Sequence, residues 1–112
     1  MFEINHTRLN RVDLVKVGGR IDSKTAPKLE KVLQGILDDD RYRIVLSMKD
    51  VTFTSSACLR VMVSALKQAK RWNRGDVRLS EVPPNIKDVL ELAGLDKLFK
   101  IYDDDVLAVG SY

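Results

Sequence analysis

The sequence of 112 residues has one cysteine and one histidine, Cys58 and His6. A single cysteine cannot close a disulfide within the chain, and one Cys with one His cannot supply the four ligands of a structural zinc site. No apolar stretch approaches the ~20 residues of a membrane span, and the first residues lack the basic start and apolar stretch of a secretory signal. We therefore expect an intracellular, cytoplasmic protein that binds neither a metal nor another cofactor.

The excess of one charge sign over the other is also small. The chain has 19 Lys and Arg against 16 Asp and Glu, a formal net charge of +3, and both signs are interspersed. It shows no zinc-finger spacing and no aromatic RNA-binding signature, so a nucleic-acid partner is not expected. The mildly basic balance favours at most an acidic protein partner. With 45% apolar and 31% charged residues, the length fits a single domain over residues 1–112.

Apolar periodicity predicts strands over residues 2–8, 12–17, 42–48, 76–82 and 100–102, and helices over about 26–37, 56–72 and 84–93. Gly18 and Gly19 should end the second strand, residues 49–54 should form a polar loop, and a last helical turn should include Val106. The order β-β-α-β-α-β-α-β predicts an α/β fold: a mixed, mostly parallel sheet with an N-terminal antiparallel edge hairpin. The unbroken run 44–46 is typical of a strand that is buried on both faces.

Partner and ligand sites in such sheets gather beyond the C-terminal ends of the strands, here at residues 18–25 and 49–56. The second segment places Thr54, Ser55 and Ser56 where a strand gives way to a helix. The start of a helix favours a phosphate group, because unpaired N–H groups and the positive end of the helix dipole meet there. The alternative is that Ser55 or Ser56 only caps the helix, worth about 1 kcal/mol, and spacing alone favours this alternative.

Three further residues have two interpretations each. Asp22 either helps to position an acceptor hydroxyl or serves as a turn or cap residue before the first helix. Cys58 is either a low-pKa redox sensor or, by residue statistics, a small buried helix residue. A serine nucleophile is disfavoured, because His6 lies in an edge strand and the chain has no Gly-x-Ser-x-Gly elbow. We expect Trp72 to anchor the core or its rim.

One face of the predicted second helix is basic. Its residues are Arg60, Lys67, Arg71 and Arg74. Such a stripe is most often a solvated face, and as a docking surface it would prefer an acidic partner.

Several segments, in order along nearly the whole chain, resemble the STAS domain of bacterial anti-sigma factor antagonists. They are Gly19-Arg20-Ile21-Asp22, Thr25-Ala26, Ile44-Val45-Leu46, residues 51–61 (VTFTSSACLRV) and residues 89–99 (VLELAGLDKLF). Against the family's usual motifs, Ser55 stands in place of Asp, Cys58 in place of Gly, and Ser47 in place of Asp or Asn.

The resemblance implies a switch protein. Ser56 would be phosphorylated by a serine kinase that is also the anti-sigma factor, and the unphosphorylated chain would bind that kinase. A PP2C-type phosphatase would restore the serine. The implied partner-binding residues are Asp22, Thr54, Ser55, Ser56, Cys58 and Arg60. The chain would be a monomer and not an enzyme, since the kinase brings the ATP. The alternative is a STAS subunit of a lipid-transport complex or of another non-sigma regulatory complex.

Overall fold

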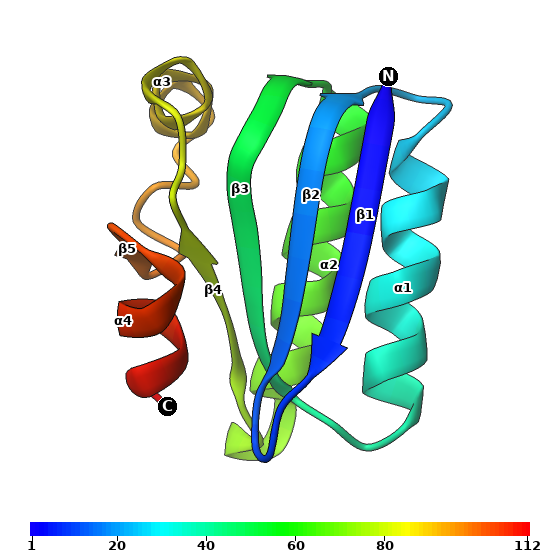
Figure 1. Ribbon diagram of the computed structural model, residues 1–112, viewed down its shortest axis with the longest axis vertical. Helices are drawn as coiled ribbons and strands as arrows, with labels where there is room; N and C mark the ends of the chain where they lie inside the picture. Colours follow the sequence, from blue (N-terminus) through cyan, green and yellow to red (C-terminus); the bar gives the residue numbers. More distant parts are fainter.

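A computed structural model describes residues 1–112, which form one five-stranded sheet with helices on both faces (Figure 1). The strands are β1 (Phe2–Arg8), β2 (Asp13–Ile21), β3 (Arg43–Thr54), β4 (Asp76–Ser80) and β5 (Ile101–Tyr102). They lie in the order β1-β2-β3-β4-β5; β1 and β2 are antiparallel, and all other neighbours are parallel. The predicted fold class, including its antiparallel edge hairpin, is confirmed.

The helices are α1 (Ala26–Asp38), α2 (Ser56–Lys70), α3 (Pro84–Leu92) and α4 (Asp105–Gly110). In Figure 1, α1 and α2 lie side by side behind the sheet. The short α4 packs on the opposite face, where Ala108 contacts Val12 and Val45. None of the helices is both long and apolar enough to cross a membrane.

The central strand β3 ties the two layers together. Ile44, Val45 and Leu46 are each completely buried, which confirms the prediction of a strand covered on both faces. Ile44 and Leu46 belong to the main core of 22 buried residues, which the strands share with α1, α2 and α3, whereas Val45 belongs to the smaller cluster under α4. This packing fixes α2 against the sheet and so fixes the position of its first residues.

Two strands are longer than predicted. β2 continues through Gly18 and Gly19 to Ile21, because Gly19 adopts φ +83° and the strand passes through register shifts without ending. A Cβ atom at Gly19 would lie 1.9 Å from the carbonyl oxygen of Met1, so only glycine fits there. β3 likewise includes the predicted polar loop 49–54, since Phe53 pairs with Arg20 and continues the ladder with β2.

The end of α2 also differs from the prediction. The helix stops at Lys70, and a 3-10 turn, Arg71–Asn73, follows it. Trp72 adopts φ +60° in this turn and is 82% exposed. The expectation that Trp72 anchors the core or rim is therefore wrong, because the backbone reversal turns the indole into solvent. β4 and β5 are shorter than the predicted ranges 76–82 and 100–102.

Candidate functional site

Ser55 and Ser56 divide two roles between them at the start of α2. Ser55 is the N-cap residue, with φ −96° and ψ 171°, and its Oγ accepts a hydrogen bond of 3.4 Å from the Cys58 N–H. Ser56 is the first residue of the helix, is exposed, and its hydroxyl makes no hydrogen bond within the chain. The cap therefore does not require Ser56, and its Oγ is free to react or to contact another molecule.

The ends of β2 and β3 bring Asp22 to the same edge of the sheet. Ile21 pairs with Thr54, and the Ile21 carbonyl accepts a hydrogen bond of 2.9 Å from the Ser55 N–H. Asp22 follows Ile21 directly, and Figure 1 shows the loop between β2 and α1 at the end of the sheet where α2 begins. The structure thus brings together, from two separate segments, the carboxylate and the hydroxyls that the sequence singled out.

One oxygen of Asp22 caps the loop before α1. Its Oδ1 accepts hydrogen bonds from the Lys24 N–H at 2.9 Å and from the Thr25 N–H at 3.1 Å. The hydrogen bond from Lys24, with those from Thr25, holds the pKa of Asp22 below its usual value, although some desolvation opposes the shift. The structural interpretation of Asp22 is confirmed. Its other oxygen, Oδ2, makes no hydrogen bond within the chain.

Two of the predicted contact residues lie beneath the surface. Cys58 is completely buried, and its Sγ lies 3.8 Å from the Met62 Sδ. Burial raises the pKa of the Cys58 thiol to about 12, so the redox-sensor interpretation is wrong. Thr54 is only 7% exposed, and its Oγ1 has no hydrogen-bond partner. Neither Cys58 nor Thr54 can provide the predicted direct contact with a partner, because the side chains that surround them cover both.

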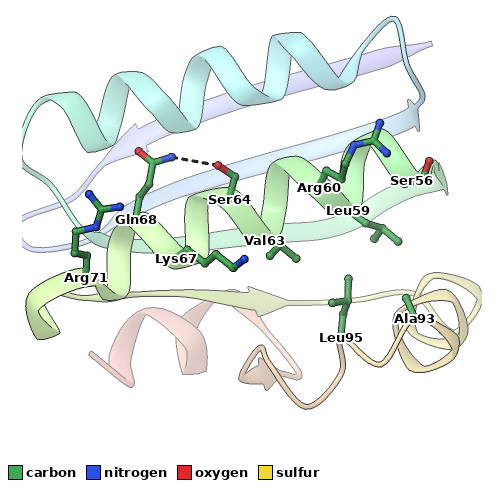
Figure 2. A pocket seen from close by; sticks show the side chains of 10 residues that line it. All are labelled: Ser56, Leu59, Arg60, Val63, Ser64, Lys67, Gln68, Arg71, Ala93 and Leu95. Atoms are coloured by element: carbon green, nitrogen blue, oxygen red, sulfur yellow. Dashed lines mark hydrogen bonds between the residues drawn. The ribbon is translucent and has the colours of Figure 1, made fainter.

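A groove of about 690 Å³ runs along α2 from Ser56 to Arg71, and we call it the α2 groove (Figure 2). Its apolar part consists of Leu59 and Val63 from α2 with Ala93 and Leu95 from the segment after α3. Its polar and charged residues are Ser56, Arg60, Ser64, Lys67, Gln68 and Arg71. No acidic residue lines it. Figure 2 shows Leu59 and Val63 directed toward Leu95, and Arg60 beside Ser56 at one end.

The prediction that both signs of charge are interspersed is wrong for this part of the chain. Residues 51–75 contain five of the 19 Lys and Arg and none of the 16 Asp and Glu, so the other residues hold 14 cations against 16 anions. Helix α2 is thus a basic element on a chain that is otherwise slightly acidic. A count of charge by segment would have found this feature in the sequence.

Arg74 does not belong to the α2 groove. It donates hydrogen bonds to the carbonyl oxygens of Gln68 and Arg71, at 2.9 and 3.1 Å, and stacks 3.7 Å above the Tyr42 ring. These contacts make Arg74 a cap of the α2 C-terminus. The predicted basic stripe is therefore reduced to Arg60, Lys67 and Arg71. None of these three takes part in the chain's six ion pairs.

One exposed pair that the sequence did not predict lies at the end of the sheet that carries Ser56. The Arg20 guanidinium stacks 4.3 Å above the Phe53 ring, and Phe53 is 39% exposed. These residues face each other in the β2–β3 register, which was hidden because residues 49–54 were predicted as a loop. The pair adds an aromatic surface and a cation to the sheet edge that carries Ser56.

The single histidine lies far from Ser56 along the sheet. His6 is paired with Val15 and lies 2.7 Å from Asp13 Oδ1, about 20 Å from the end of β2 at 3.3 Å per strand residue. No group of three or more His, Cys, Asp or Glu side chains that could hold a metal ion is formed. What the site does offer is an exposed, unbonded hydroxyl at a helix start, with cations along the same helix.

Comparison with known proteins gives one consistent result. The sequence profile of the STAS domain family matches residues 3–106. The anti-sigma-B factor antagonist of Staphylococcus aureus is 32% identical over 87 residues, which cover 78% of this chain and 80% of that protein.

Solved structures agree in fold. An anti-sigma factor antagonist from Mycobacterium paratuberculosis superposes with a TM-score of 0.88 at 24% identity, covering 99% of this chain and 93% of its own. SpoIIAA in its unphosphorylated form gives a TM-score of 0.82 at 13% identity, over 96% of this chain and 93% of its own. The phosphorylated form of SpoIIAA, a Bacillus cell fate determinant, gives a TM-score of 0.78 at 11% identity. The superposition covers 97% of this chain and 98% of that chain.

Proposed function

Because the chain belongs to the STAS domain family, we propose that it is an anti-sigma factor antagonist controlled by phosphorylation of Ser56. The unphosphorylated chain binds an anti-sigma factor that is also a serine kinase, and the phosphorylated chain releases it. A PP2C-type phosphatase returns Ser56 to its free form. The chain acts in the cytoplasm as a monomer, and it is the kinase's substrate, not a catalyst.

The observation that carries this proposal is the free hydroxyl of Ser56. Ser55 already caps α2, so esterification of Ser56 Oγ breaks no hydrogen bond of the folded chain. The first helical turn contains no acidic residue, and a phosphate at this position is favoured by the N-terminal N–H groups. The hydroxyl is exposed, so a kinase can reach it without unfolding the helix. The solved phosphorylated and unphosphorylated forms of SpoIIAA are a precedent in the same fold.

The transfer step requires little from this chain. Ser56 Oγ attacks the γ-phosphorus of the kinase's ATP, the bond to the bridging oxygen of ADP breaks, and the hydroxyl proton passes to a base. Asp22 is a weak base for that proton, because the hydrogen bond from Lys24 keeps its pKa low. We assign the proton-accepting base to the kinase and assign Asp22, through its free Oδ2, to orienting the hydroxyl.

Release of the partner then follows from charge. A neutral hydroxyl can be covered by a protein surface at modest cost, whereas a phosphate of about −2 must be desolvated or paired with a cation. Arg60 lies one helical turn after Ser56 and is unpaired, so it is placed to hold the phosphate on the chain itself. A difference of about 3 kcal/mol between the two forms changes affinity more than a hundredfold.

The experiment is incubation of the chain with the host's candidate serine kinase and Mg-ATP, followed by intact mass and peptide mapping. We expect one phosphate, on Ser56, and none in Ser56→Ala. Ser55→Ala is the matched control: it weakens the cap of α2 but should still accept phosphate. Phosphate on another residue contradicts the site. Stable association with an ATPase subunit that leaves Ser56 unmodified contradicts the function and favours a STAS subunit of a transport complex.

A further inference from the structure

The α2 groove has the features of a docking surface for a helix. Its apolar part is formed by Leu59, Val63 and Leu95, which pack against the core from below and remain partly exposed. It extends from Ser56 to Arg71, about 22 Å at 1.5 Å per helical residue, which is four turns of a facing helix.

The charges along the groove select the partner's sign. Arg60, Lys67 and Arg71 line it, no acidic residue does, and none of the three cations is paired within the chain. The whole segment 51–75 is free of Asp and Glu, so nothing local neutralises them. Unpaired cations along one side of an apolar strip complement an amphipathic segment that has carboxylates along one side of its apolar face.

We infer that an acidic amphipathic helix of the partner lies in the α2 groove, with its apolar face on Leu59, Val63 and Leu95 and its carboxylates on Arg60, Lys67 and Arg71. This inference rests on the proposed function and names the partner's contacting element. A strand is excluded as the occupant, because the groove is bounded by a helix and a loop and offers no unpaired strand edge.

This arrangement also explains why one phosphate acts on a long interface. Ser56 and Arg60 lie at the same end of the groove (Figure 2). A phosphate on Ser56 repels the carboxylates of the docked helix and captures Arg60, which that helix would otherwise use. The modification thus removes one attraction and adds one repulsion at the same place.

The test measures the affinity of the full chain for the kinase that phosphorylates it, with magnesium and a non-hydrolysable ATP analogue. In the variant Lys67→Glu/Arg71→Glu, two attractive cations become repulsive anions, and we expect binding at least about tenfold weaker. The matched control is Lys28→Glu/Lys31→Glu, the same charge change on two exposed residues of α1, with binding close to that of the unchanged chain. Raising the salt concentration should weaken kinase binding by the unchanged chain more than kinase binding by the groove variant.

A second variant separates docking from long-range attraction. Ala93 is exposed and has φ −84°, so glutamine fits the backbone at this position. Ala93→Gln fills the apolar part of the groove without changing charge. We expect a loss of affinity of about threefold or more. If the kinase binds the unchanged chain but both groove variants match the α1 control, the inference is wrong and the proposed function stands. If the kinase neither binds nor phosphorylates the unchanged chain, both are wrong.

Discussion

The start of β2 and the α2 groove differ in how they use charge. At the start of β2, Asp13 is completely buried and bonds to Arg41 Nε at 2.5 Å and to His6 at 2.7 Å, with Arg8 at 3.7 Å. Along the α2 groove, in contrast, the cations Arg60, Lys67 and Arg71 are exposed and unpaired. Buried charges that a chain pairs internally are costly to leave without their partners, whereas charge left unpaired on one face is available to another molecule. The charges at the start of β2 therefore belong to the fold, and those of the α2 groove belong to recognition.

Removal of Asp13 should have the largest effect on stability. In Asp13→Ala the buried carboxylate is lost, and Arg41, whose side chain is only 23% exposed, keeps its charge without a carboxylate and retains only its hydrogen bond to the Leu9 carbonyl oxygen. We expect the free energy of unfolding to fall by about 3 kcal/mol, measured in urea. The groove variant Lys67→Glu/Arg71→Glu should leave that free energy within about 0.5 kcal/mol. Equal destabilisation by the two variants would remove the distinction between the start of β2 and the α2 groove.

Burial of Cys58 predicts a loss of stability at high pH. The thiol has a pKa of about 12 in the folded chain against 9.0 for an ordinary cysteine, so above pH 9 the unfolded chain ionises and the folded chain does not. Stability from this group is complete below pH 9 and falls above it, by up to about 1.4 kcal/mol per pH unit. Tyr112 contributes in the same direction, so the contribution of Cys58 is the difference from Cys58→Ala. If the free energy of unfolding depends on pH in the same way for the unchanged chain and for Cys58→Ala between pH 9 and 11, the burial of the thiol is contradicted.

The two roles of Asp22 can be separated by Asp22→Asn. Asparagine keeps an Oδ1 that accepts from the Lys24 and Thr25 N–H groups, so the loop and α1 should remain, and unfolding at pH 7 should change little. The free carboxylate oxygen at the end of the sheet that carries Ser56 is lost, and we expect phosphorylation several times slower, measured as kcat/KM with the kinase. An unchanged rate would leave Asp22 with its structural role alone.

The smallest effect is expected at Trp72, in a third region that neither stabilises the chain nor forms the groove. Its φ of +60° suits asparagine better than tryptophan, and its side chain is 82% exposed. Trp72→Asn should raise the free energy of unfolding by up to about 0.5 kcal/mol and leave kinase binding unchanged. A loss of stability would show that the indole packs in solution.

The sequence predicts the fold well, because the fold rests on periodicity. The alternation in β1, the unbroken apolar run in β3 and the spacing of apolar residues in α1 each specify one element. The boundaries it misses depend on tertiary contacts. Gly18 and Gly19 commonly end strands, and here pairing with both β1 and β3 keeps them within β2. The polar residues 49–54 become a strand because β2 pairs with them.

The site is predictable only where a local sequence pattern specifies it. The hydroxyls at the start of α2 are visible as a cap pattern, but which serine caps is decided by backbone geometry at Ser55. The resemblance counts Cys58 among the partner-binding residues, yet its position on α2 places the side chain in the core. The α2 groove needs Leu95, more than twenty residues away along the chain, and no local pattern pairs these segments.

The central claim is that one phosphate on Ser56 decides whether the partner binds. The direct measurement is the affinity of the kinase, with magnesium and a non-hydrolysable ATP analogue, for the chain in two forms: unmodified, and carrying phosphoserine at position 56 in every molecule. We predict binding of the phosphorylated form at least a hundredfold weaker, with helix content and unfolding unchanged. Equal affinity for the two forms would contradict the account.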